Sequence, residues 1–459
     1  MRWSRSRLST RVAYGTAASA GPDIVPRGTG LLPSFAFRHG QRTIILMKIV
    51  VLTQNFPPEV GATAARLHKM TKSLAGKGHS VTVITAMPNY PTGRTFEGYR
   101  GKIRTQDDID GVRVVRTWIF PSNSSKFLPR FLSYASFTLS SLLMGIWGIG
   151  RQDIVLFDTP PLPLVPTGLA IGRLTGAWVI MNVSDIWPEM ALQLGHPMGR
   201  ASLWVLKRLE SFGYRRADIV TTTNGAAKER INERFPQVRT AVIGNGADLR
   251  VFDPALRSQE IRDSLGADQG DFLVGYFGLH GLFQGLHVVV EAAERLRDRR
   301  TIKFVMVGDG PCKADIVALA EGKGLDNIRF ADLVDQGRIP SYVASCDVAL
   351  VPLAAEFPGT IPSKVYETLA SGVPLVISSG CEGAKLVEEG KAGWTFPPGD
   401  SDALADVLAE LDTDREVVSQ MSSNCRALAN QFDYDRIAVE TEAILQAVSD
   451  GASIPEFGR

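Results

Sequence analysis

The sequence predicts an α/β protein built from two doubly wound parallel sheets. From residue 47 onward, short runs of β-branched and other apolar residues alternate with longer runs of helical period. This alternation stops in a Gly-, Asp- and Pro-rich segment at 242–254 and starts again at 271. Two similar domains that face a cleft are the simplest architecture with this pattern.

The first half supplies the strands and one clear helix of an N-terminal domain. The strands are expected at 48–53, 79–87, 153–158, 178–183 and 218–224. An amphipathic helix is expected at 64–78, because its apolar positions recur at helical spacing and it ends at a glycine. We place this domain at 47–250.

The second half repeats the pattern and predicts a C-terminal domain at 255–428. Its strands are expected at 271–278, 303–311, 327–334, 347–353 and 373–378. A helix is expected at 286–299, and a final helix at 432–448 closes the chain. We expect the segment 429–450 to pack back on the N-terminal domain.

Chain length, cysteine spacing and net charge exclude several classes of protein. The chain has 459 residues, enough for two or three full cores. Its four cysteines are far apart and form no C-x-x-C pair, which indicates reduced thiols in a cytosolic compartment rather than a disulfide framework or zinc knuckle. The net charge is +2, and a balance of +6 within residues 1–46 leaves −4 for the remainder. Nucleic-acid binding by the body of the protein is therefore not expected.

The first 46 residues differ from the rest. They are rich in Arg, Ser, Gly and Pro and show no usable periodicity. Met47 then opens a strand, so we expect it to be the natural start, preceded by a disordered extension or a misassigned start codon. An Arg-rich, acid-poor leader also resembles a mitochondrial transit peptide, which we rank lower.

One uncharged stretch, at 131–149, has basic residues at its flanks (Lys126, Arg130 and Arg151). Its nineteen residues are long enough for a membrane span, but five hydroxyl residues weaken that interpretation. We favour attachment to a membrane surface through 127–150. An ordinary buried helix is the nearest alternative, and a true span ranks third.

The segment 359–372 (GTIPSKVYETLASG) is the most informative. It joins two expected strands, so its loop lies at the carboxyl edge of a parallel sheet, where open α/β sheets bind ligands. The helix start favours an anion. Lys364 and Glu367 share a helix face, where one suits a diphosphate and the other a sugar diol. A solvated Lys–Glu pair is an equally plausible interpretation of these two residues alone.

Two N-terminal segments add candidate residues. Gly61 lies in a loop before a helix, where a phosphate or sugar could approach the backbone, although a structural turn explains it as well. Asp185, Trp187 and Glu189 follow a strand, and carboxylates beside an aromatic ring suit a sugar. The alternative is a helix cap with a packed tryptophan.

Several motifs are missing. The sequence lacks G-x-G-x-x-G and G-x-x-x-x-G-K-[ST], which disfavours a dinucleotide oxidoreductase and a P-loop ATPase. Its four D-x-D triplets fall in polar turns or helix starts, and Asp110-Gly111 is typical of a hairpin turn. The six histidines show no ligand spacing, and only His280 lies near the expected cleft. No metal site is therefore expected.

Together these segments resemble the family 4 glycosyltransferases, over about residues 47–450. The resemblance rests on the opening strand–loop–helix, the IGNGAD linker, the MVGDGP turn and SKVYETLASGVPLV. It implies a retaining transferase with two Rossmann-like domains in the GT-B arrangement. Further segments (AMPNYPTG, VSDIWPE, GLFQGL and GTIPSK) resemble a branch that builds bacterial surface polysaccharides and includes N-acetyl-fucosaminyl and related deoxyhexosaminyl transferases.

The resemblance assigns Glu367 to the donor ribose and Gly61 to the donor phosphate or transferred sugar. Three positions depart from the family. The first family glutamate is replaced by Gly359, and the usual Arg and Lys for the diphosphate fall at Leu279 and Gln284. We therefore expect Lys364 and the N-terminus of its own helix to neutralise the diphosphate instead.

The expected donor site comprises Gly61, Gly278, Gln284, Thr360, Ile361, Ser363, Lys364 and Glu367. The amides near Thr360 and Ile361 would assist Lys364 in stabilising the departing diphosphate. Asp185 or Glu189 would orient or deprotonate the acceptor hydroxyl. Domain closure should assemble the site, since each domain holds one substrate.

The expected reaction is metal-independent transfer of a sugar from a nucleoside-diphosphate donor to a lipid-linked or saccharide acceptor. We expect the donor to be a UDP-sugar and favour an N-acetylated deoxyhexosamine as the transferred sugar. The protein would need no cofactor and would be cytoplasmic, on the inner face of the plasma membrane. Two alternatives stay open: a nucleotide-sugar 2-epimerase, and a sugar-nucleotide-binding protein that has lost catalysis.

Overall fold

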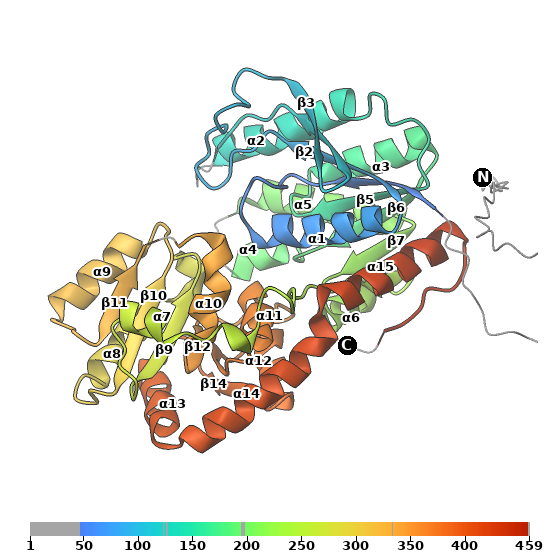
Figure 1. Cartoon of the computed structure of the whole chain (residues 1–459). Helices are drawn as coiled ribbons and strands as arrows, with labels where there is room; N and C mark the ends of the chain where they lie inside the picture. Colours follow the sequence, from blue (N-terminus) through green and yellow to red (C-terminus); the bar gives the residue numbers. More distant parts are fainter. Residues whose placement is uncertain (1–45, 123, 125–126, 194–197, 333, 458–459) are drawn as a thin grey trace, which may run out of the picture.

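The structure is a computed structural model, and it describes residues 46–122, 124, 127–193, 198–332 and 334–457. Within these residues the chain forms two sheets. One has eight strands in the order β3-β4-β2-β1-β5-β6-β7-β8, and the other has six in the order β11-β10-β9-β12-β13-β14. Apart from the antiparallel pair β3–β4, the strand pairs are parallel. The predicted pair of doubly wound domains is confirmed (Figure 1).

The N-terminal domain carries the larger sheet. Its strands are β1 (Lys48–Leu52), β2 (Ser80–Ala86), β3 (Arg104–Ile109), β4 (Val112–Thr117), β5 (Ile154–Thr159), β6 (Trp178–Val183), β7 (Ile219–Thr222) and β8 (Thr240–Val242). Its helices are α1 (Ala62–Gly76), α2 (Phe127–Ser140), the π-helical turn η1 (Ser141–Gly145), α3 (Leu164–Thr175), α4 (Glu189–Gln193), α5 (Arg200–Arg216) and α6 (Gly225–Arg234). The five strands expected here are present, whereas β3, β4 and β8 were not predicted as strands.

The C-terminal domain carries β9 (Phe272–Phe277), β10 (Ile302–Val307), β11 (Ile328–Ala331), β12 (Val348–Val351), β13 (Leu375–Ser378) and β14 (Gly393–Phe396). Its helices are α7 (Gln259–Ser264), α8 (His287–Arg295), α9 (Lys313–Gly322), α10 (Ile339–Ala344), α11 (Ser363–Ala370), α12 (Glu382–Glu389), α13 (Ser401–Thr413) and α14 (Arg415–Ala429). Short 3-10 turns η2 (Pro254–Leu256), η3 (Leu282–Gln284), η4 (Gln336–Arg338) and η5 (Asn430–Phe432) connect some of these elements. The sequence did not predict β14, whose four residues are only partly apolar.

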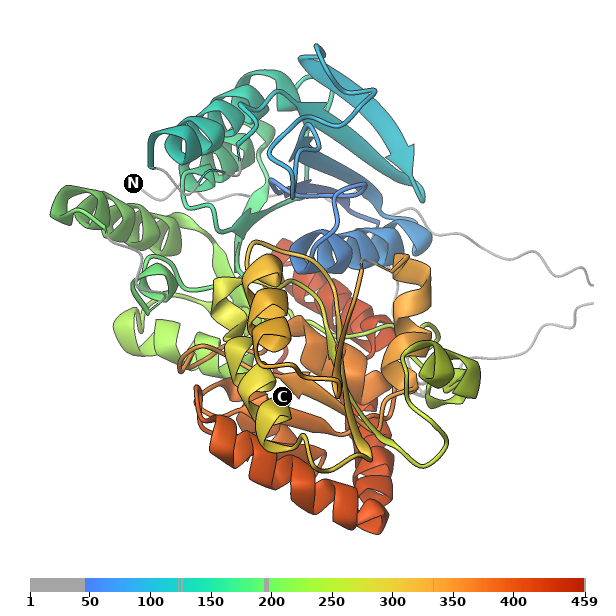
Figure 2. The ribbon, with the colours of Figure 1, turned by 90° about the vertical axis from the view of Figure 1, so that its left-hand side faces the viewer.

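The N-terminal sheet is covered on both faces. One buried cluster contains side chains of α2, α3, α5 and α6, and the other contains side chains of α1 and of the last helix, α15 (Tyr434–Ser449). In Figure 2 the teal α2 accordingly lies on the opposite side of this sheet from the blue α1. α15 leaves the C-terminal domain and contacts α1 (Figure 1), which links the end of the chain to the N-terminal domain.

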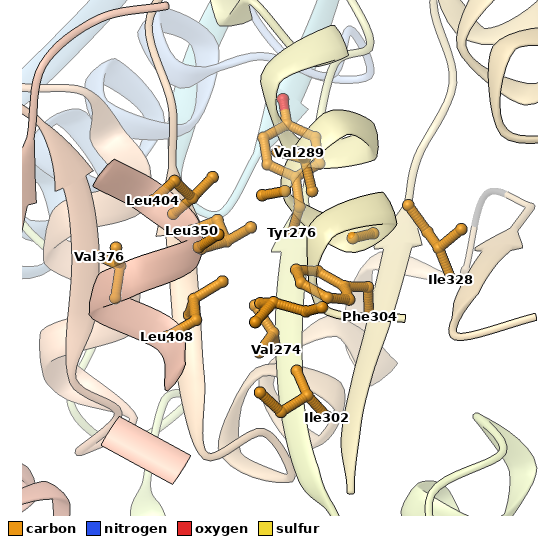
Figure 3. Close-up of a cluster of buried hydrophobic side chains, with 14 of the residues drawn as sticks. Val274, Tyr276, Val289, Ile302, Phe304, Ile328, Leu350, Val376, Leu404 and Leu408 are labelled. Carbon is orange, nitrogen blue, oxygen red and sulfur yellow. The ribbon is translucent and has the colours of Figure 1, made fainter. Parts of the chain in front are cut away.

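The core of the C-terminal domain centres on the middle strands of its sheet. Val274, Phe304, Leu350 and Val376 pack with side chains from α8 and α13 (Figure 3). Tyr276 ends this cluster with its ring buried, and its hydroxyl points away from the apolar side chains (Figure 3). The carboxyl end of β9 therefore carries a polar atom directly at the edge of the core.

The D-x-D triplets have the structural roles that were expected. Asp110 and Gly111 have φ angles of 55° and 78° and join the antiparallel strands β3 and β4. The acidic side chains of Asp400, Asp414 and Asp433 accept hydrogen bonds from backbone N–H groups at the starts of α13, α14 and α15. These carboxylates are therefore committed to turns and helix caps.

The uncharged stretch at 131–149 spans most of α2, then η1 and the following turn. Among the described residues, no helix has the length and apolar character needed to cross a membrane. Phe137 is fully buried, whereas Leu139 is 59% exposed. The segment is thus a helix with one side packed on the sheet and the other open. The extension predicted at 1–46 lies outside the described residues, except for Leu46.

Candidate active site

A cavity of about 580 Å³ lies between the two domains. Its walls come from the loops that follow β1, β2, β5 and β6 of the first sheet and β9 and β12 of the second. Each loop follows the carboxyl end of a parallel strand, which is where such sheets bind ligands. The two sheets thus direct their ligand-binding edges into one shared space.

A buried carboxylate holds the wall after β2. Glu59 is 4% exposed, and its Oε1 accepts the backbone N–H groups of Asn89 at 2.7 Å and Tyr90 at 2.8 Å. Burial raises the pKa of Glu59, while these N–H groups and Arg116 oppose the rise. Asn89 and Tyr90 line the cavity. The sequence analysis missed this residue, because the loop it holds is 30 positions away in the chain.

Arg66 of α1 organises the wall after β5 and β6. It is 5% exposed, and its Nη2 donates to Asp158 Oδ1 at 2.9 Å and to Ser184 Oγ at 2.7 Å. Asp185 follows directly and lines the cavity. Burial and the charge of Asp158 raise the pKa of Asp185, and Arg66 opposes this. The raised pKa makes Asp185 a stronger base than an ordinary aspartate.

Glu189 has a different position from Asp185. Its carboxylate pairs with Arg230 and lies 3.8 Å from Arg234, both on α6. It lines a separate hollow of only about 20 Å³ rather than the large cavity. Of the two carboxylates expected on the acceptor side, Asp185 therefore lines the large cavity and Glu189 does not.

The loop before α11 reaches the cavity through Thr360 and Pro362. The backbone N–H of Thr360 donates to the carbonyl of Phe357 at 3.2 Å, so it is not available to a phosphate as was expected. Ile361 is partly buried against the second core of the domain. α11 begins at Ser363, and no side chain caps its start. The first N–H groups of α11 are therefore left without a side-chain cap beside the cavity.

Lys364 lies under the loop that follows β9 rather than on the cavity wall. Its Nζ donates to the Tyr276 hydroxyl at 2.7 Å and lies 4.1 Å from the centre of the tyrosine ring. Gly278 has a φ of 134°, and a Cβ on it would lie 2.5 Å from Lys364 Cε. Gly278 thus leaves the space that the lysine occupies. Burial lowers the pKa of Lys364 to about 7, and Glu367 counteracts this shift.

His280 lies close to this lysine. Its side chain is fully buried, and neither ring nitrogen has a hydrogen-bond partner within the described part of the chain. Burial, Lys313 and Lys364 lower its pKa to about 4, against a smaller effect of Asp309. Its ring centre is 5.7 Å from that of Tyr276. The base of the site therefore holds an uncharged imidazole beside the lysine.

Glu367 is partly buried on α11, three residues after Lys364. Burial raises its pKa to about 7, and Lys364 opposes the rise. The pKa of the Tyr434 hydroxyl is raised mainly by burial, and both Arg66 and Glu367 act on it electrostatically. Tyr434 therefore has an N-terminal-domain cation and Glu367 nearby. Lys364 and Glu367 are both partly buried, and neither side chain lines the cavity.

Some of the remaining predicted residues line the cavity and others do not. Gln284 lines the cavity, and its Oε1 is buried without a hydrogen-bond partner among the described residues. Gly61 caps α1 and is exposed; Tyr90 is 3.8 Å from where its Cβ would be. Leu279, which stands where the family has a cation, is 45% exposed and brings no positive charge to the site. In the described residues, no three His, Cys, Asp or Glu side chains gather as metal ligands would.

Two family models match the chain. The model described as "Glycosyl transferases group 1" matches residues 271–414, and the one described as "Glycosyl transferase 4-like domain" matches residues 61–246. Together they cover most of both sheets. The chain is a glycosyltransferase of the GT-B type. The family part of the resemblance found in the sequence is thereby confirmed.

Curated relatives agree with this family. The chain is 28% identical over 364 residues to the "Putative colanic acid biosynthesis glycosyl transferase WcaI" of Escherichia coli, covering 76% of this chain and 87% of the relative. It is also 28% identical over 304 residues to the "Probable glycosyltransferase WbjE" of Pseudomonas aeruginosa, covering 64% of this chain and 75% of the relative.

Solved structures share the fold of this glycosyltransferase. HepE of Anabaena in complex with UDP has a TM-score of 0.65 at 20% identity, covering 87% of this chain and 100% of that one. WaaG, a glycosyltransferase of lipopolysaccharide biosynthesis, has a TM-score of 0.62 at 16% identity, covering 86% and 99%. At this identity the likeness establishes the GT-B fold alone.

Proposed function

We propose that this glycosyltransferase moves a sugar from a UDP-sugar to a lipid-linked or saccharide acceptor in the synthesis of a bacterial surface polysaccharide. The observation that carries the proposal is the cavity shared by the carboxyl edges of both sheets, with the start of α11 at its rim. The names of the relatives WcaI and WbjE support the glycan class, and the HepE complexes with UDP and UDP-glucose support the donor.

In the proposed reaction, the bond between the anomeric carbon and the donor phosphate oxygen breaks, and UDP departs. The acceptor hydroxyl oxygen bonds to the same carbon on the same face, so the configuration is retained. Lys364 and the open start of α11 stabilise the negative charge that develops on the diphosphate. Asp185 receives or directs the acceptor proton, because it lines the cavity and has a raised pKa. Glu367 accepts hydrogen bonds from the ribose.

The proposal includes no metal ion and no cofactor. Neutralisation of the diphosphate relies on Lys364 and on backbone dipoles, since Leu279 and Gln284 occupy the positions of the usual cations. We also propose a cytoplasmic protein attached to the inner face of the plasma membrane, with an N-acetylated deoxyhexosamine as the transferred sugar. The membrane proposal rests on the open side of α2 and on the lipid-linked acceptor.

The proposal is tested with purified protein and a panel of nucleotide sugars. Calorimetry should show binding of a UDP-sugar, with UDP-N-acetylated deoxyhexosamines first in the panel, and radiolabel from the bound donor should enter a bacterial membrane extract. An epimer formed from the donor alone would favour the 2-epimerase. Binding without transfer to any extract would favour a protein that has lost catalysis. Failure to bind any nucleotide sugar would overturn the proposal.

A further inference from the structure

The side of the N-terminal domain opposite α1 exposes an unusual amount of apolar surface. Of the 21 large apolar side chains that are exposed among the described residues, nine belong to α2, η1, α3, α5 or the turn after η1. We call this the α2–α5 surface. Its nine apolar residues are Phe131, Leu132, Leu139, Leu143, Trp147, Leu174, Trp204, Val205 and Phe212. Contacts of α3 with α2, η1 and α5 make these elements neighbours, so the side chains share one face.

The charges on this surface are of one sign. α5 exposes five cations, Arg200, Lys207, Arg208, Arg215 and Arg216. The only acidic residue in α2, η1, α3 and α5 is Glu210, which is buried and accepts two hydrogen bonds from Arg234, at 2.9 and 2.7 Å. The exposed cations of these elements therefore have no acidic side chain on the same helices to neutralise them.

The cations and aromatic rings are also arranged in pairs. The guanidinium of Arg208 lies 5.2 Å from the ring centre of Trp204, and that of Arg216 lies 5.5 Å from the ring centre of Phe212. In each pair the cation is four residues after the ring, on the same helix face. Aromatic rings beside cations suit the headgroup region of a bilayer, where rings insert and cations meet phosphates.

The surface continues to the cavity. Arg130 and Tyr134 of α2 line the cavity, while their neighbours Phe131 and Leu132 are 50% and 43% exposed. A membrane against this surface would therefore lie beside the acceptor side of the site. A lipid-linked acceptor could enter the cavity past the start of α2 without leaving the bilayer.

We infer that the α2–α5 surface docks on an anionic lipid bilayer. This deepens the proposed function, since it names the surface from which a lipid-linked acceptor would arrive. It also extends the segment expected from sequence, because five exposed cations lie on α5, outside 127–150. Charge complementarity selects the occupant: an unbroken cationic face matches anionic headgroups and would repel a second copy of itself.

Co-sedimentation with vesicles tests this inference. The full chain should bind vesicles of phosphatidylcholine containing one quarter phosphatidylglycerol, and binding should weaken as salt is raised. The Lys207→Glu/Arg208→Glu variant should bind at least about 25-fold more weakly, because each cation near an anionic surface contributes about fivefold. The Trp204→Ser/Phe212→Ser variant should also lose binding. The matched control is Arg299→Glu/Arg300→Glu, which reverses two adjacent exposed cations of the C-terminal domain and should bind like the parent.

Three results would overturn the inference. The first is absence of binding to these vesicles at low salt. The second is equal binding by the two charge-reversed variants. The third is a dimer in light scattering that the Trp204→Ser/Phe212→Ser variant loses while vesicles go unbound, which would assign the surface to self-association. UDP-sugar affinity is measured on every variant and should be unchanged. If the parent protein fails to bind vesicles but transfers sugar normally, the docking surface is excluded and the proposed function is left intact.

Discussion

Burial opposes the charge of Lys364, and the Tyr276 groups that contact its Nζ carry no negative charge to offset this. Tyr276 offers a hydroxyl and a ring, and His280 offers an imidazole whose pKa is about 4. In the described residues no carboxylate oxygen lies within ion-pair distance of its Nζ, although Glu367 acts on it electrostatically. A bound diphosphate would supply the missing negative charge. We therefore expect donor binding and protonation of Lys364 to be coupled.

The first prediction concerns the pH dependence of donor affinity. Because the pKa of Lys364 in the empty site is about 7, the ammonium form is lost as the pH rises above that value. The affinity for a UDP-hexose should then fall by up to about tenfold per pH unit. Calorimetry from about pH 6 to 9 measures this. Lys364→Met should bind weakly, and its affinity should no longer fall as the pH rises.

Glu367 needs its own control in this experiment. Its pKa is also about 7, so it gains a negative charge over the same range and becomes a better acceptor for ribose hydroxyls. The Glu367→Gln variant removes this opposing effect and should show the fall caused by Lys364 more steeply. A parent protein and a Lys364→Met variant with the same pH profile would exclude Lys364 from diphosphate binding.

The second prediction concerns Tyr276. Its hydroxyl accepts from Lys364 and donates to the Leu279 carbonyl at 2.6 Å, so it fixes both the lysine and the loop after β9. Tyr276→Phe should weaken UDP binding about tenfold, since a hydrogen bond to a charged group contributes about 1.5–3 kcal/mol. The ring stays in the core, so thermal stability should change little. Tyr214→Phe removes a buried hydroxyl in the other domain and should leave the affinity unchanged.

At the scale of elements, α1 is fastened to the ends of β5 and β6 by a buried charge. Arg66 pairs with Asp158, which also accepts from Ser184 Oγ at 2.9 Å. Ser184 precedes Asp185, so the same contact places the acceptor-side carboxylate. In a buried pair of this kind each partner depends on the other, because an unpaired charge has lost its hydration.

The third prediction is that Asp158→Asn destabilises the protein by about 3–5 kcal/mol, because Arg66 would stay buried without its counter-charge. Thermal unfolding measures the loss. Asp110→Asn is the matched control: Asp110 pairs with Lys72 at 3.1 Å on the surface, and asparagine tolerates its positive φ. It should cost less than about 1 kcal/mol. Equal losses would show that burial does not set the strength of the Arg66 pair.

Two loops of the C-terminal domain approach each other closely at the site. A Cβ on Gly308, after β10, would lie 1.9 Å from the carbonyl oxygen of Gly278, after β9. The His280 N–H also donates to the Asp309 carbonyl at 2.9 Å. The loops after β9 and β10 are therefore packed closely and hydrogen-bonded to each other beside Lys364.

At the scale of the whole molecule, the chain crosses between the domains at two adjacent places. Ala247, in the linker, forms a bridge with Asp433, at the start of α15, and its N–H donates to the Phe432 carbonyl at 3.0 Å. A Cβ on Gly246 would lie 1.9 Å from that carbonyl oxygen. Two crossings side by side leave one axis about which the domains can close on substrates.

Beyond this crossing, α15 is fixed to the N-terminal domain by a carboxylate. Glu442 accepts from Lys77 Nζ at 2.7 Å and from His79 Nε2 at 2.9 Å. His79 Nδ1 accepts the Met47 N–H at 3.1 Å, which assigns the remaining ring proton to Nε2. Burial disfavours the charge of Glu442, but Lys77 and His79 outweigh it and lower its pKa.

The fourth prediction follows from this lowered pKa. The stabilisation by Glu442 is fully present above its unfolded pKa of about 4.5 and is lost as the pH falls through the lower folded value. Glu442→Gln should therefore cost about 1–3 kcal/mol at pH 7. The difference from the parent should shrink toward zero in strong acid. Thermal unfolding at several pH values measures it, and a difference that is constant with pH would contradict the ionic role.

Much of the fold could be predicted from local patterns. Buried strands such as β1, β6 and β9 are continuous apolar runs, and α15 has a clear helical period, so their sequence alone identifies them. β3, β4, β8 and β14 were not predicted as strands. β8 and β14 are hard to find because they have three and four residues and depend on pairing with a neighbour. The loop before α11 was located correctly, because a strand–loop–helix–strand pattern fixes its place at a sheet edge.

The sequence by itself determined the two-sheet architecture and brought Lys364, Glu367 and Asp185 into consideration, because period and motif spacing are local properties of the chain. Only the tertiary structure separated Asp185 from Glu189, committed the Thr360 amide to Phe357, and placed Tyr276, His280 and Gly278 around Lys364. Those partners are up to 88 positions apart in the chain. The charge state of a site depends on burial and on such distant neighbours, which exist only once the sheets have formed.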